Sequence, residues 1–348
     1  MRYIGFTIYL HYYVLHTGVR ELKPIILGVC SAFFFAFTFV LNRMMEVEGG
    51  SWIWSASLRF FFMVPLLLII VIARKKLSAT FAEMKKAPMQ WVMWSTIGFG
   101  LFYAPLCYAS AYGPSWLIAG TWQITIISGS LLAPLFYETI QTSKGPIQVK
   151  GKIPFKSLAM ALIILLGVAI MQIEHATTLS LVSVLLCTLP ILVASFAYPL
   201  GNRKMMVVVS NRLDAYQRVL GMTIASLPFW IILAIYGLIT AGPPRTSQVI
   251  QSGWVALFSG VIATVLFFAA TNMVKGDMKK LGAVEATQSL EVLFALLGEM
   301  ILLGMPLPTY VSCIGIVLVI VGMALNSYVS SRKGNKETKE EMKQATTL

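Results

Sequence analysis

The sequence has little charge for its length. Only 12% of its 348 residues are Asp, Glu, Lys or Arg, whereas 57% are hydrophobic and the mean hydropathy is +0.78. A soluble domain carries about 25% charged residues, because its surface must be hydrated. The shortage of charge excludes a water-soluble globular protein, and we expect an integral membrane protein.

Residues that bind metals or carry out covalent catalysis are also scarce. The three histidines have no metal-ligand spacing, and the four cysteines lie inside apolar runs, where we expect no disulfide. There is no HExxH, no GxSxG and no glycine-rich loop ending in GK[ST]. We therefore expect no enzyme, no cofactor and no metal. These absences also exclude an ATP-driven pump, unless a separate subunit supplies the nucleotide site.

Long apolar runs dominate the chain. A helix needs about 20 apolar residues to cross the hydrocarbon core of a bilayer. We predict ten such transmembrane helices, joined by mostly short links that leave no room for a soluble domain: Pro24–Arg43, Ser55–Ala73, Gln90–Tyr112, Ser115–Tyr137, Ser157–Ile173, Leu181–Gly201, Arg218–Thr240, Gly253–Lys275, Ala283–Gly304 and Thr309–Val329.

The 27 Lys and Arg residues are unevenly distributed among the links. If the N-terminus is cytoplasmic, 24 of them lie in cytoplasmic segments, Arg43 and Arg245 lie outside, and Arg59 lies within the second run. Basic residues concentrate on the cytoplasmic side of membrane proteins. We therefore expect a multi-pass protein of the cell (plasma) membrane with both termini in the cytoplasm, and no nucleic-acid partner.

The two halves of the chain resemble each other. An Asn-Arg pair begins at Asn42 and again at Asn202, 160 residues later, and Leu106–Ser110 matches Leu266–Ala270 at the same spacing. Since each half contains five predicted helices, an odd number, the second copy must be inverted in the membrane. Inverted repeats are the plan of many secondary transporters, whose substrate site lies near the midplane.

A third match, Thr121–Gln123 with Ala286–Gln288, has a spacing of 165, and the longer loop around Lys275–Gly282 accounts for the shift. We predict an all-α integral membrane protein of ten transmembrane helices in two inverted five-helix repeats. The predicted parts are an N-terminal segment 1–22, a first repeat 23–173, a second repeat 181–330 and a cytoplasmic tail 331–348. Residues 1–22 are expected to be an interfacial segment or to result from a start codon assigned too early.

One stretch carries a family resemblance. Ser289–Glu299, continued through Gly304 to Pro306 and followed by Gly315 and Gly322, resembles the drug/metabolite transporter superfamily, in particular its EamA-like members. Met305 departs from the pattern, since family members often have a glutamate there.

Phe102–Gly113 is also similar to that superfamily, so the resemblance covers about residues 23–330. The sequence is most similar to the branch named multidrug-resistance efflux transporters. The resemblance implies a bacterial membrane and the transport of a small molecule.

Three acidic residues lie in the ninth predicted helix, where an ionisable group is costly and is a functional candidate. Glu285, Glu291 and Glu299 fall with Gln288 in a sector of about 120°, so this stripe must face the bundle interior or a water-filled path. We expect Glu285 to be solvated at the cytoplasmic end. Glu291 and Glu299 are candidates for coupling proton and substrate movement, and structural pairing is the alternative for both.

Aromatic and polar side chains of neighbouring helices are candidates for a substrate cavity. They are Gln288 of the ninth predicted helix, Trp122, Gln123 and Ser130 of the fourth, and Tyr108 and Tyr112 of the third. Aromatic faces near a carboxylate attract organic cations. The alternative is a structural role, because the same side chains also pack the interior of helical bundles and anchor helices at the membrane interface.

Arg59 is another candidate, for which we weigh two roles: snorkelling outward and pairing with Glu299. We expect a secondary active transporter that exports small organic molecules, drug-like or metabolite, by proton antiport. The alternatives are a uniporter or importer of a neutral metabolite and a non-transporting membrane scaffold. The expected partners are a small-molecule substrate, protons or another coupling ion, and membrane lipid. Gly315 and Gly322 allow the tenth predicted helix to pack closely against a neighbouring helix, either within the chain or across a homodimer.

Overall fold

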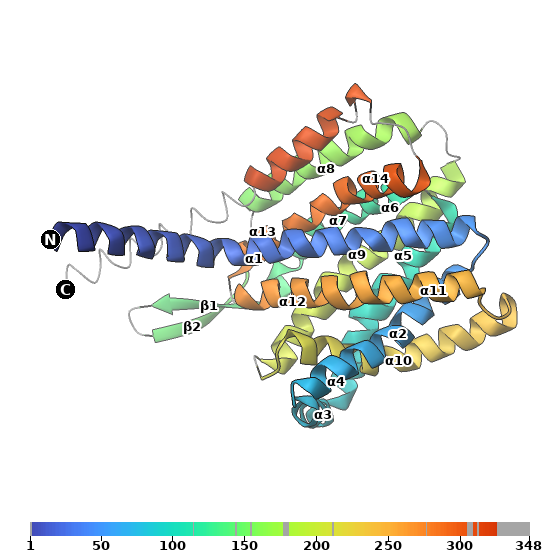
Figure 1. Cartoon of the computed structure of the whole chain (residues 1–348), viewed down its shortest axis with the longest axis horizontal. Helices are drawn as coiled ribbons and strands as arrows, with labels where there is room; N and C mark the ends of the chain where they lie inside the picture. The colour runs from blue at the N-terminus through green and yellow to red at the C-terminus, as the bar shows by residue number, and fades with distance from the viewer. Residues whose placement is uncertain are drawn as a thin grey trace.

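The computed structural model describes the backbone of residues 2–113, 115–142, 145–153, 155–176, 181–210, 212–275, 277–304, 309–311 and 313–325. They form a bundle in which most helices run side by side along one axis (Figure 1). The predicted cytoplasmic tail, residues 331–348, lies outside the described part.

Seven helical stretches among the described residues are long and apolar enough to cross a membrane. They lie within the following helices: α1 (Arg2–Val47), α2 (Trp52–Ala73), α4 (Pro88–Ser95) with η1 (Thr96–Gly100) and α5 (Leu101–Tyr112), α9 (Leu181–Val209), α10 (Ala215–Thr240), α11 (Thr246–Val255) with η3 (Ala256–Ala263) and α12 (Thr264–Met273), and α13 (Met278–Ala286) with η4 (Thr287–Ser289) and α14 (Leu290–Leu303). The protein is therefore an all-α membrane protein, as predicted, apart from one short hairpin.

The remaining predicted runs correspond to shorter helices. They are α6 (Ser115–Trp122) with α7 (Ile124–Leu131) and η2 (Ala133–Leu135), α8 (Phe155–Ala176), and an apolar helix over Cys313–Leu325. A further helix, α3 (Leu77–Lys86), links α2 to α4. Residues 2–22, predicted as a separate segment, continue α1.

An antiparallel hairpin follows η2 and was not predicted. Strand β1 (Tyr137–Thr142) pairs with β2 (Gly145–Lys150), and Tyr137 lies opposite Lys150. It projects from the same end of the bundle as the N-terminus (Figure 1). Two strands of six residues have no long periodic pattern, which is why sequence analysis assigned this segment to a link.

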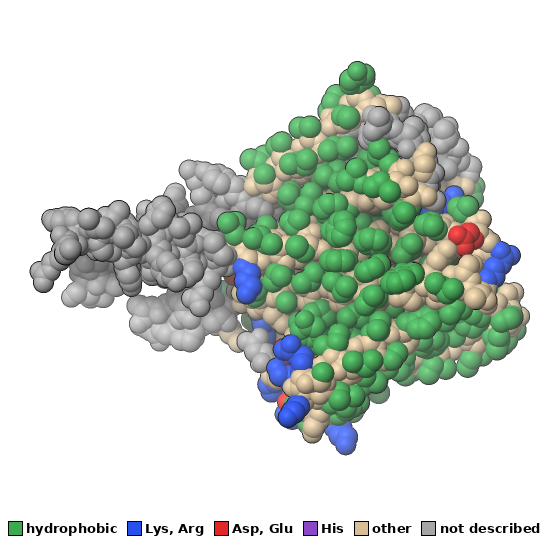
Figure 2. Space-filling view, in the orientation of Figure 1, with side chains coloured by type: hydrophobic (Ala, Val, Ile, Leu, Met, Phe, Trp, Pro, Cys, Tyr) green, Lys and Arg blue, Asp and Glu red, His purple; other side chains and the backbone are tan. Residues whose placement is uncertain are grey.

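The surface of the bundle matches a lipid environment. Hydrophobic side chains cover the long sides, and Lys and Arg gather at the two ends, mostly at the end where the hairpin lies (Figure 2). Ile69 and Ile72 of α2, for example, are largely exposed, whereas Leu67 and Val71 are buried. A helix that is apolar on both its buried and its exposed face is typical of a membrane span.

Glycines allow the closest helix contacts. A Cβ on Gly201 of α9 would lie 2.3 Å from Cα of Gly98 in η1. A Cβ on Gly167 of α8 would lie 2.7 Å from the carbonyl oxygen of Gly315, and one on Gly322 would lie 2.8 Å from Ile164. The two glycines of the last helix therefore pack against α8 within the chain.

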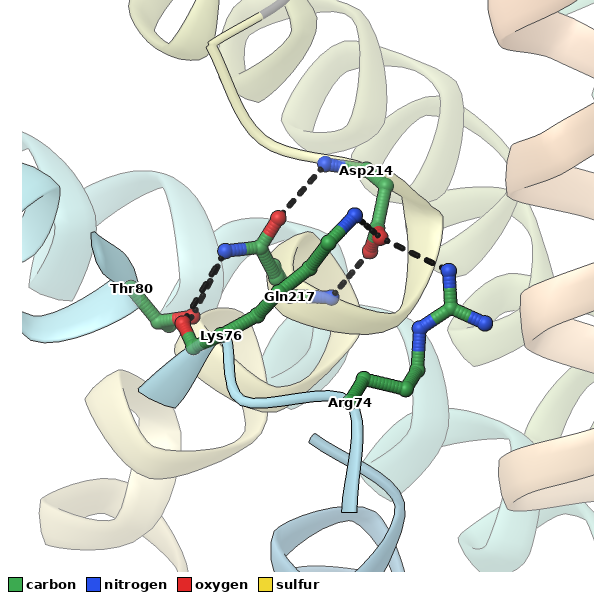
Figure 3. A network of polar contacts seen from close by, with 5 residues as sticks. All are labelled: Arg74, Lys76, Thr80, Asp214 and Gln217. Atoms are coloured by element: carbon green, nitrogen blue, oxygen red, sulfur yellow. Dashed lines mark hydrogen bonds and ion pairs between the residues drawn. The ribbon is translucent and has the colours of Figure 1, made fainter. Parts of the chain in front are cut away.

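A polar network fixes α10 to the link between α2 and α3 (Figure 3). Asp214 caps α10: its carboxylate accepts a hydrogen bond from the backbone N–H of Gln217 (3.0 Å), while the Gln217 side chain accepts one from the Asp214 N–H (3.1 Å). Lys76 (2.8 Å) and Arg74 (3.2 Å) form ion pairs with the same carboxylate. Gln217 also donates to the Thr80 hydroxyl (3.2 Å).

Partial burial disfavours the charged form of Asp214, but the hydrogen bonds from Lys76 and Gln217 outweigh it, and the pKa of the carboxyl lies below its ordinary value. The ion pairs therefore contribute stability that is complete above the ordinary pKa of about 3.9 and is lost as the pH falls through the lower pKa of the folded state.

Asp214→Asn tests this. Asn is an equally good helix cap, so at pH 7 the variant loses only the ion pairs, at a cost of up to about 1 kcal/mol. The melting temperatures of variant and wild type in detergent should differ at pH 7, begin to converge only below about pH 4, and become equal once the pH lies below the lowered pKa of folded Asp214. Lys75→Gln, at an exposed neighbour, should have no effect at either pH. A difference that persists in acid would contradict the ionic origin.

Candidate functional site

A cavity lies between helices of both halves of the chain. Its walls come from α1, α5, α6, α7, α9, α12, α13, η4 and α14. It is lined by the aromatic residues Phe35, Phe39, Phe102, Trp122, Tyr198 and Phe267, by the polar residues Thr38, Thr125, Asn202, Glu285, Gln288 and Glu291, and by Leu106 and Pro199.

The cavity is narrow in this conformation. About 520 Å³ lies between the lining atoms, but the centres of water-sized molecules fit into only about 20 Å³ of it. This is room for roughly one water molecule. A larger organic molecule can therefore enter only when helices or aromatic rings move apart.

Aromatic rings form a continuous wall of the cavity. The ring centroid of Phe102 lies 4.6 Å from that of Tyr198 and 5.0 Å from that of Trp122, and Tyr198 lies 5.7 Å from Phe267. The Tyr198 hydroxyl and the Asn202 side-chain oxygen are buried, and neither has a hydrogen-bond partner in the described part of the chain. Both polar atoms are thus free to bind a ligand.

Glu291 lies in this wall with only 2% of its surface exposed. It follows the 3₁₀ turn η4, which interrupts the helix and sets the start of α14. The indole of Trp122 lies in the same wall of the cavity. Among the described residues, no basic side chain pairs with Glu291. A carboxylate in this position can bind either a proton or a cationic group.

Glu285, one and a half turns earlier, has a different environment. Its two oxygens accept hydrogen bonds from Nη2 (2.5 Å) and Nε (3.1 Å) of Arg203, whose Nη1 donates to the carbonyl oxygen of Gly129 (2.5 Å). Glu285 is 7% exposed, so the expectation that it is solvated was wrong. Position along the helix suggested water, but the sequence does not reveal that Arg203 of α9 lies beside α13.

Gly129 allows this ion pair to form against α7. A Cβ at position 129 would lie 2.8 Å from Oε2 of Glu285 and 3.1 Å from Nη2 of Arg203. The bidentate pair therefore joins α7, α9 and α13 at the wall of the cavity. Charge-assisted bidentate contacts of this kind are among the strongest polar interactions in proteins.

Of the other candidates from sequence, Gln288 and Trp122 also line the cavity. Gln288 lies in η4, where its amide donates to the carbonyl oxygen of Gly28 (3.3 Å). Gln123 is buried at the break between α6 and α7, and its amide donates to the Ala119 carbonyl (3.0 Å). Gln123 is not among the lining residues, nor is Ser130, whose hydroxyl bonds to the backbone of its own helix.

The two tyrosines lie away from the cavity. Tyr108 packs against Trp52 at 5.4 Å and Tyr112 at 4.8 Å, and Tyr112 is exposed. Glu299 is buried but does not line the cavity. One of its oxygens accepts a hydrogen bond from the Ser115 hydroxyl, and the other has no partner in the described part.

Arg59 adopts neither of the two roles weighed for it. It is 2% exposed, which rules out snorkelling, and it forms no ion pair with Glu299. Its guanidinium turns inward onto the ring of Tyr103, at 3.9 Å from the centroid. The aromatic face and a hydroxyl inside the bundle hold it there.

Sequence reasoning missed several lining residues. Tyr198 and Phe267 lie in apolar helices where nothing distinguishes them from ordinary packing residues. Arg203 did carry a signal, as part of the repeated Asn-Arg pair, but its position at the end of a predicted span placed it in a cytoplasmic link.

An apolar helical bundle around a small cavity with an unpaired carboxylate and aromatic walls defines a membrane protein of the transporter type. The family model described as "EmrE: Putative multidrug resistance efflux transporter" matches residues 22–332. The chain belongs to this family, within the drug/metabolite transporter superfamily, as its sequence resemblance implies.

The proteins similar to the chain include two relatives and a solved structure. "Uncharacterized protein YjlA" of Bacillus subtilis (strain 168) is 53% identical over 322 residues, which cover 92% of this chain and 99% of the relative. "Uncharacterized 42.1 kDa protein in intracellular alkaline protease 3'region" of Shouchella clausii is 48% identical, covering 77% and 70%. A structure described as "Crystal structure of protein" has a TM-score of 0.64 at 13% identity, covering 89% and 98%, and shares the fold.

Glu285→Ala tests the buried ion pair. The substitution leaves the Arg203 guanidinium buried without a carboxylate, which should lower the free energy of unfolding by about 3–5 kcal/mol. Thermal unfolding in detergent measures this loss.

The matched control replaces both partners, Arg203→Met with Glu285→Leu. Apolar residues of similar volume remove both charges together and should restore most of the lost stability. The single variants Arg203→Met and Glu285→Leu complete the cycle: if the double variant loses as much stability as the two single variants together, the two side chains do not depend on each other.

Proposed function

We propose that the protein is a proton-coupled secondary transporter that exports small organic molecules across the plasma membrane. The observation that carries this proposal is Glu291: a buried carboxylate without an ionic partner in the described part, in the wall of a cavity rich in aromatic rings. An ionisable group at such a position is functional by default, because its burial is costly.

The proposed exchange uses the two states of one carboxyl group. Ionised Glu291 attracts a cationic group of the substrate, and the rings of Trp122 and Phe102 supply apolar and cation–π contacts. A proton that enters from the other side neutralises the carboxylate, removes this attraction and releases the substrate outward. Proton uptake and substrate release are coupled because both use the same site.

We further propose that ten helices form two inverted repeats that rock against each other around the cavity. Local irregularities of the backbone support this arrangement. The π-helical segments η1 and η3 begin at Thr96 and Ala256, 160 residues apart. The helix break at Gln123 and the 3₁₀ turn that contains Gln288 are 165 residues apart. These are the spacings at which the sequence halves match.

The shorter apolar helices α6 with α7, α8 and Cys313–Leu325 complete the ten helices in this proposal. The charges favour an orientation with both termini in the cytoplasm, since Lys and Arg gather mostly at the end of the bundle that carries the hairpin (Figure 2). Glu285 and Arg203 would then close the cytoplasmic side of the cavity.

A second candidate function is the uniport or import of a neutral metabolite. The Gln288 side chain, the Tyr198 hydroxyl and the Asn202 side-chain oxygen line the cavity and offer hydrogen bonds that such a substrate needs. This function does not need Glu291 to change its charge.

The experiment compares Glu291→Gln with wild type in liposomes that contain a trapped pH dye. Candidate amines and neutral metabolites are added, and the dye reports proton movement. Wild type should move protons when a substrate is added, and the Gln variant should lose at least about 90% of this signal because an amide cannot be protonated in this range. Glu291→Asp, which keeps the acid, should retain part of it.

Glu299→Gln is the matched control, since it removes a buried carboxylate of the same helix that does not line the cavity. Loss of coupling in Glu299→Gln alone would move the coupling role to that residue. Substrate uptake that is unchanged in Glu291→Gln would favour the uniporter.

A further inference from the structure

Arg59 is a buried cation in the membrane-spanning helix α2. It lies seven residues after Trp52, roughly 10 Å along the helix from its start, and is 2% exposed. Its guanidinium covers the Tyr103 ring at 3.9 Å and lies 5.5 Å from that of Phe60. Contact with ring faces partly stabilises the charge, but rings accept no strong hydrogen bonds.

The hydrogen-bonding capacity of Arg59 is largely unused. Nη2 donates to the Ser259 hydroxyl at 3.1 Å, whereas Nε and Nη1 are buried without a partner in the described part of the chain. No carboxylate of a described residue lies within ion-pair distance of it. A guanidinium carries five N–H donors, so a buried arginine normally has several oxygen acceptors around it.

The other two buried arginines differ from Arg59 in this respect. Arg203 has the Glu285 carboxylate. Arg218, near the start of α10, donates to the side-chain oxygen of Asn272 (2.7 Å) and to the Phe268 carbonyl (3.4 Å). Arg59 alone among these three has no carboxylate, amide or carbonyl acceptor. An unpaired buried charge is strongly destabilising, so an acceptor that binds transiently is the simplest reason to keep it.

A short path of hydroxyl groups connects Arg59 with the cavity. Ser259, which accepts from Arg59, is hydrogen-bonded to the Thr38 hydroxyl, and Thr38 lines the cavity. Ser259 lies in the π-helical segment η3, an irregularity frequent at functional sites. Its neighbour Gly260 has no side chain between helices, and a Cβ there would lie 3.4 Å from Nε of Arg59.

The charges around the cavity also indicate an acidic ligand group. Among the described buried residues Glu285 and Arg203 neutralise each other, whereas Glu291, Glu299, Arg59 and Arg218 have no ionic partner. Of these four, Glu291 lines the cavity and Arg59 is connected to it through Ser259 and Thr38. A purely cationic substrate would pair only with Glu291 and leave Arg59 unpaired. A molecule that carries both a cationic and an acidic group would satisfy both.

We propose that Arg59 is a substrate-binding residue that holds the acidic group of a small zwitterion, while Glu291 holds its cationic group. The inference rests on the proposed transport function and names its substrate class. When the narrow cavity opens, the acidic group takes the place of the Ser259 hydroxyl on Nη2 of Arg59 and accepts from Nη2 and the free Nε, the two parallel donors of one guanidinium edge. A carboxylate matches this pair of donors in geometry, as Glu285 does on Arg203.

The test measures binding of matched pairs of probes to the purified protein in lipid nanodiscs. Each pair is an amino acid and the amine that lacks its carboxylate: phenylalanine with phenethylamine, leucine with isoamylamine, and lysine with cadaverine. In at least one pair, wild type should bind the amino acid about tenfold more tightly, because charge-assisted hydrogen bonds of this size are lost with the carboxylate.

Arg59→Gln should abolish this preference and leave the affinity for the amine within about twofold, and Arg59→Lys should retain part of it. Arg218→Gln, which removes a buried arginine that donates to Asn272 and Phe268, should keep the preference and controls for folding. Equal affinity for acid and amine in every pair, or a preference that survives in Arg59→Gln, overturns the inference.

The failure of the inference is distinguishable from failure of the proposed transport function. If amines drive a proton movement that depends on Glu291, but the protein has no preference for the amino acid over the amine, the proposed antiport stands and the role of Arg59 is overturned. A preference for the acid that depends on Arg59, without proton movement for either probe, supports the anion site and counts against proton coupling.

Discussion

Every charged group inside the hydrocarbon must find its compensation within the protein, and the arrangement of this bundle follows from that constraint. Water and salt are absent at this depth, so a buried charge is stabilised only by an opposite charge, hydrogen bonds or aromatic faces. The Arg203–Glu285 pair meets the requirement fully: the guanidinium donates two hydrogen bonds to the Glu285 carboxylate and one to the Gly129 carbonyl oxygen. It joins three helices and so fixes one wall of the cavity.

Glu291 and Arg59 meet the same requirement only in part. Arg59 has one hydrogen bond and lies on an aromatic ring, and Glu291 shares the aromatic wall of the cavity. Neither has an ionic partner in the described residues. In a membrane such incomplete compensation is expensive, which distinguishes these two side chains from the structural ion pair. Both lie beside the narrow cavity, and we infer that each is kept unpaired so that a ligand can bind to it and dissociate again.

Breaks in the helices make this arrangement possible. A regular helix satisfies all of its own backbone groups, and its side chains follow one fixed periodicity. The π-helical turn at Ser259 and the 3₁₀ turn at Gln288 change that periodicity locally and turn polar side chains towards the interior. Backbone groups freed by such turns are tolerated in a membrane only where other protein groups surround them. Irregular backbone and buried charge therefore occur together.

The sequence was informative wherever one signal was strong on its own. Long apolar runs predicted the membrane-length helices, and the rarity of acids in such runs directed attention to Glu291. Of the predicted stripe of four residues, Glu285, Gln288 and Glu291 reach the cavity, whereas Glu299, about 12 Å further along α14 than Glu291, contacts Ser115 instead. A rotation of 100° per residue predicts the face on which a residue lies, but not how far along the helix the cavity extends.

Contacts between distant helices were the limit of prediction. Whether Glu285 is solvated or paired depends on where α9 lies, and whether Arg59 snorkels depends on the Tyr103 ring and on Ser259 of η3, some 200 residues away. A single sequence contains the residue types but not these distances. The repeated Asn-Arg pairs gave some spatial information, because a repeat indicates positions that are equivalent in the two halves of the chain.

The narrow cavity and its two unpaired charges impose opposite demands that only a moving structure can satisfy. Aromatic rings in contact exclude water from the cavity, which strengthens any ionic contact formed there. The same closure leaves Glu291 and Arg59 poorly compensated as long as no ligand is present. A zwitterion that separates the rings would provide both missing partners and offset the cost of opening. Substrate binding and opening of the cavity would then be one coupled equilibrium, because the charges that need the ligand lie behind the rings that exclude it.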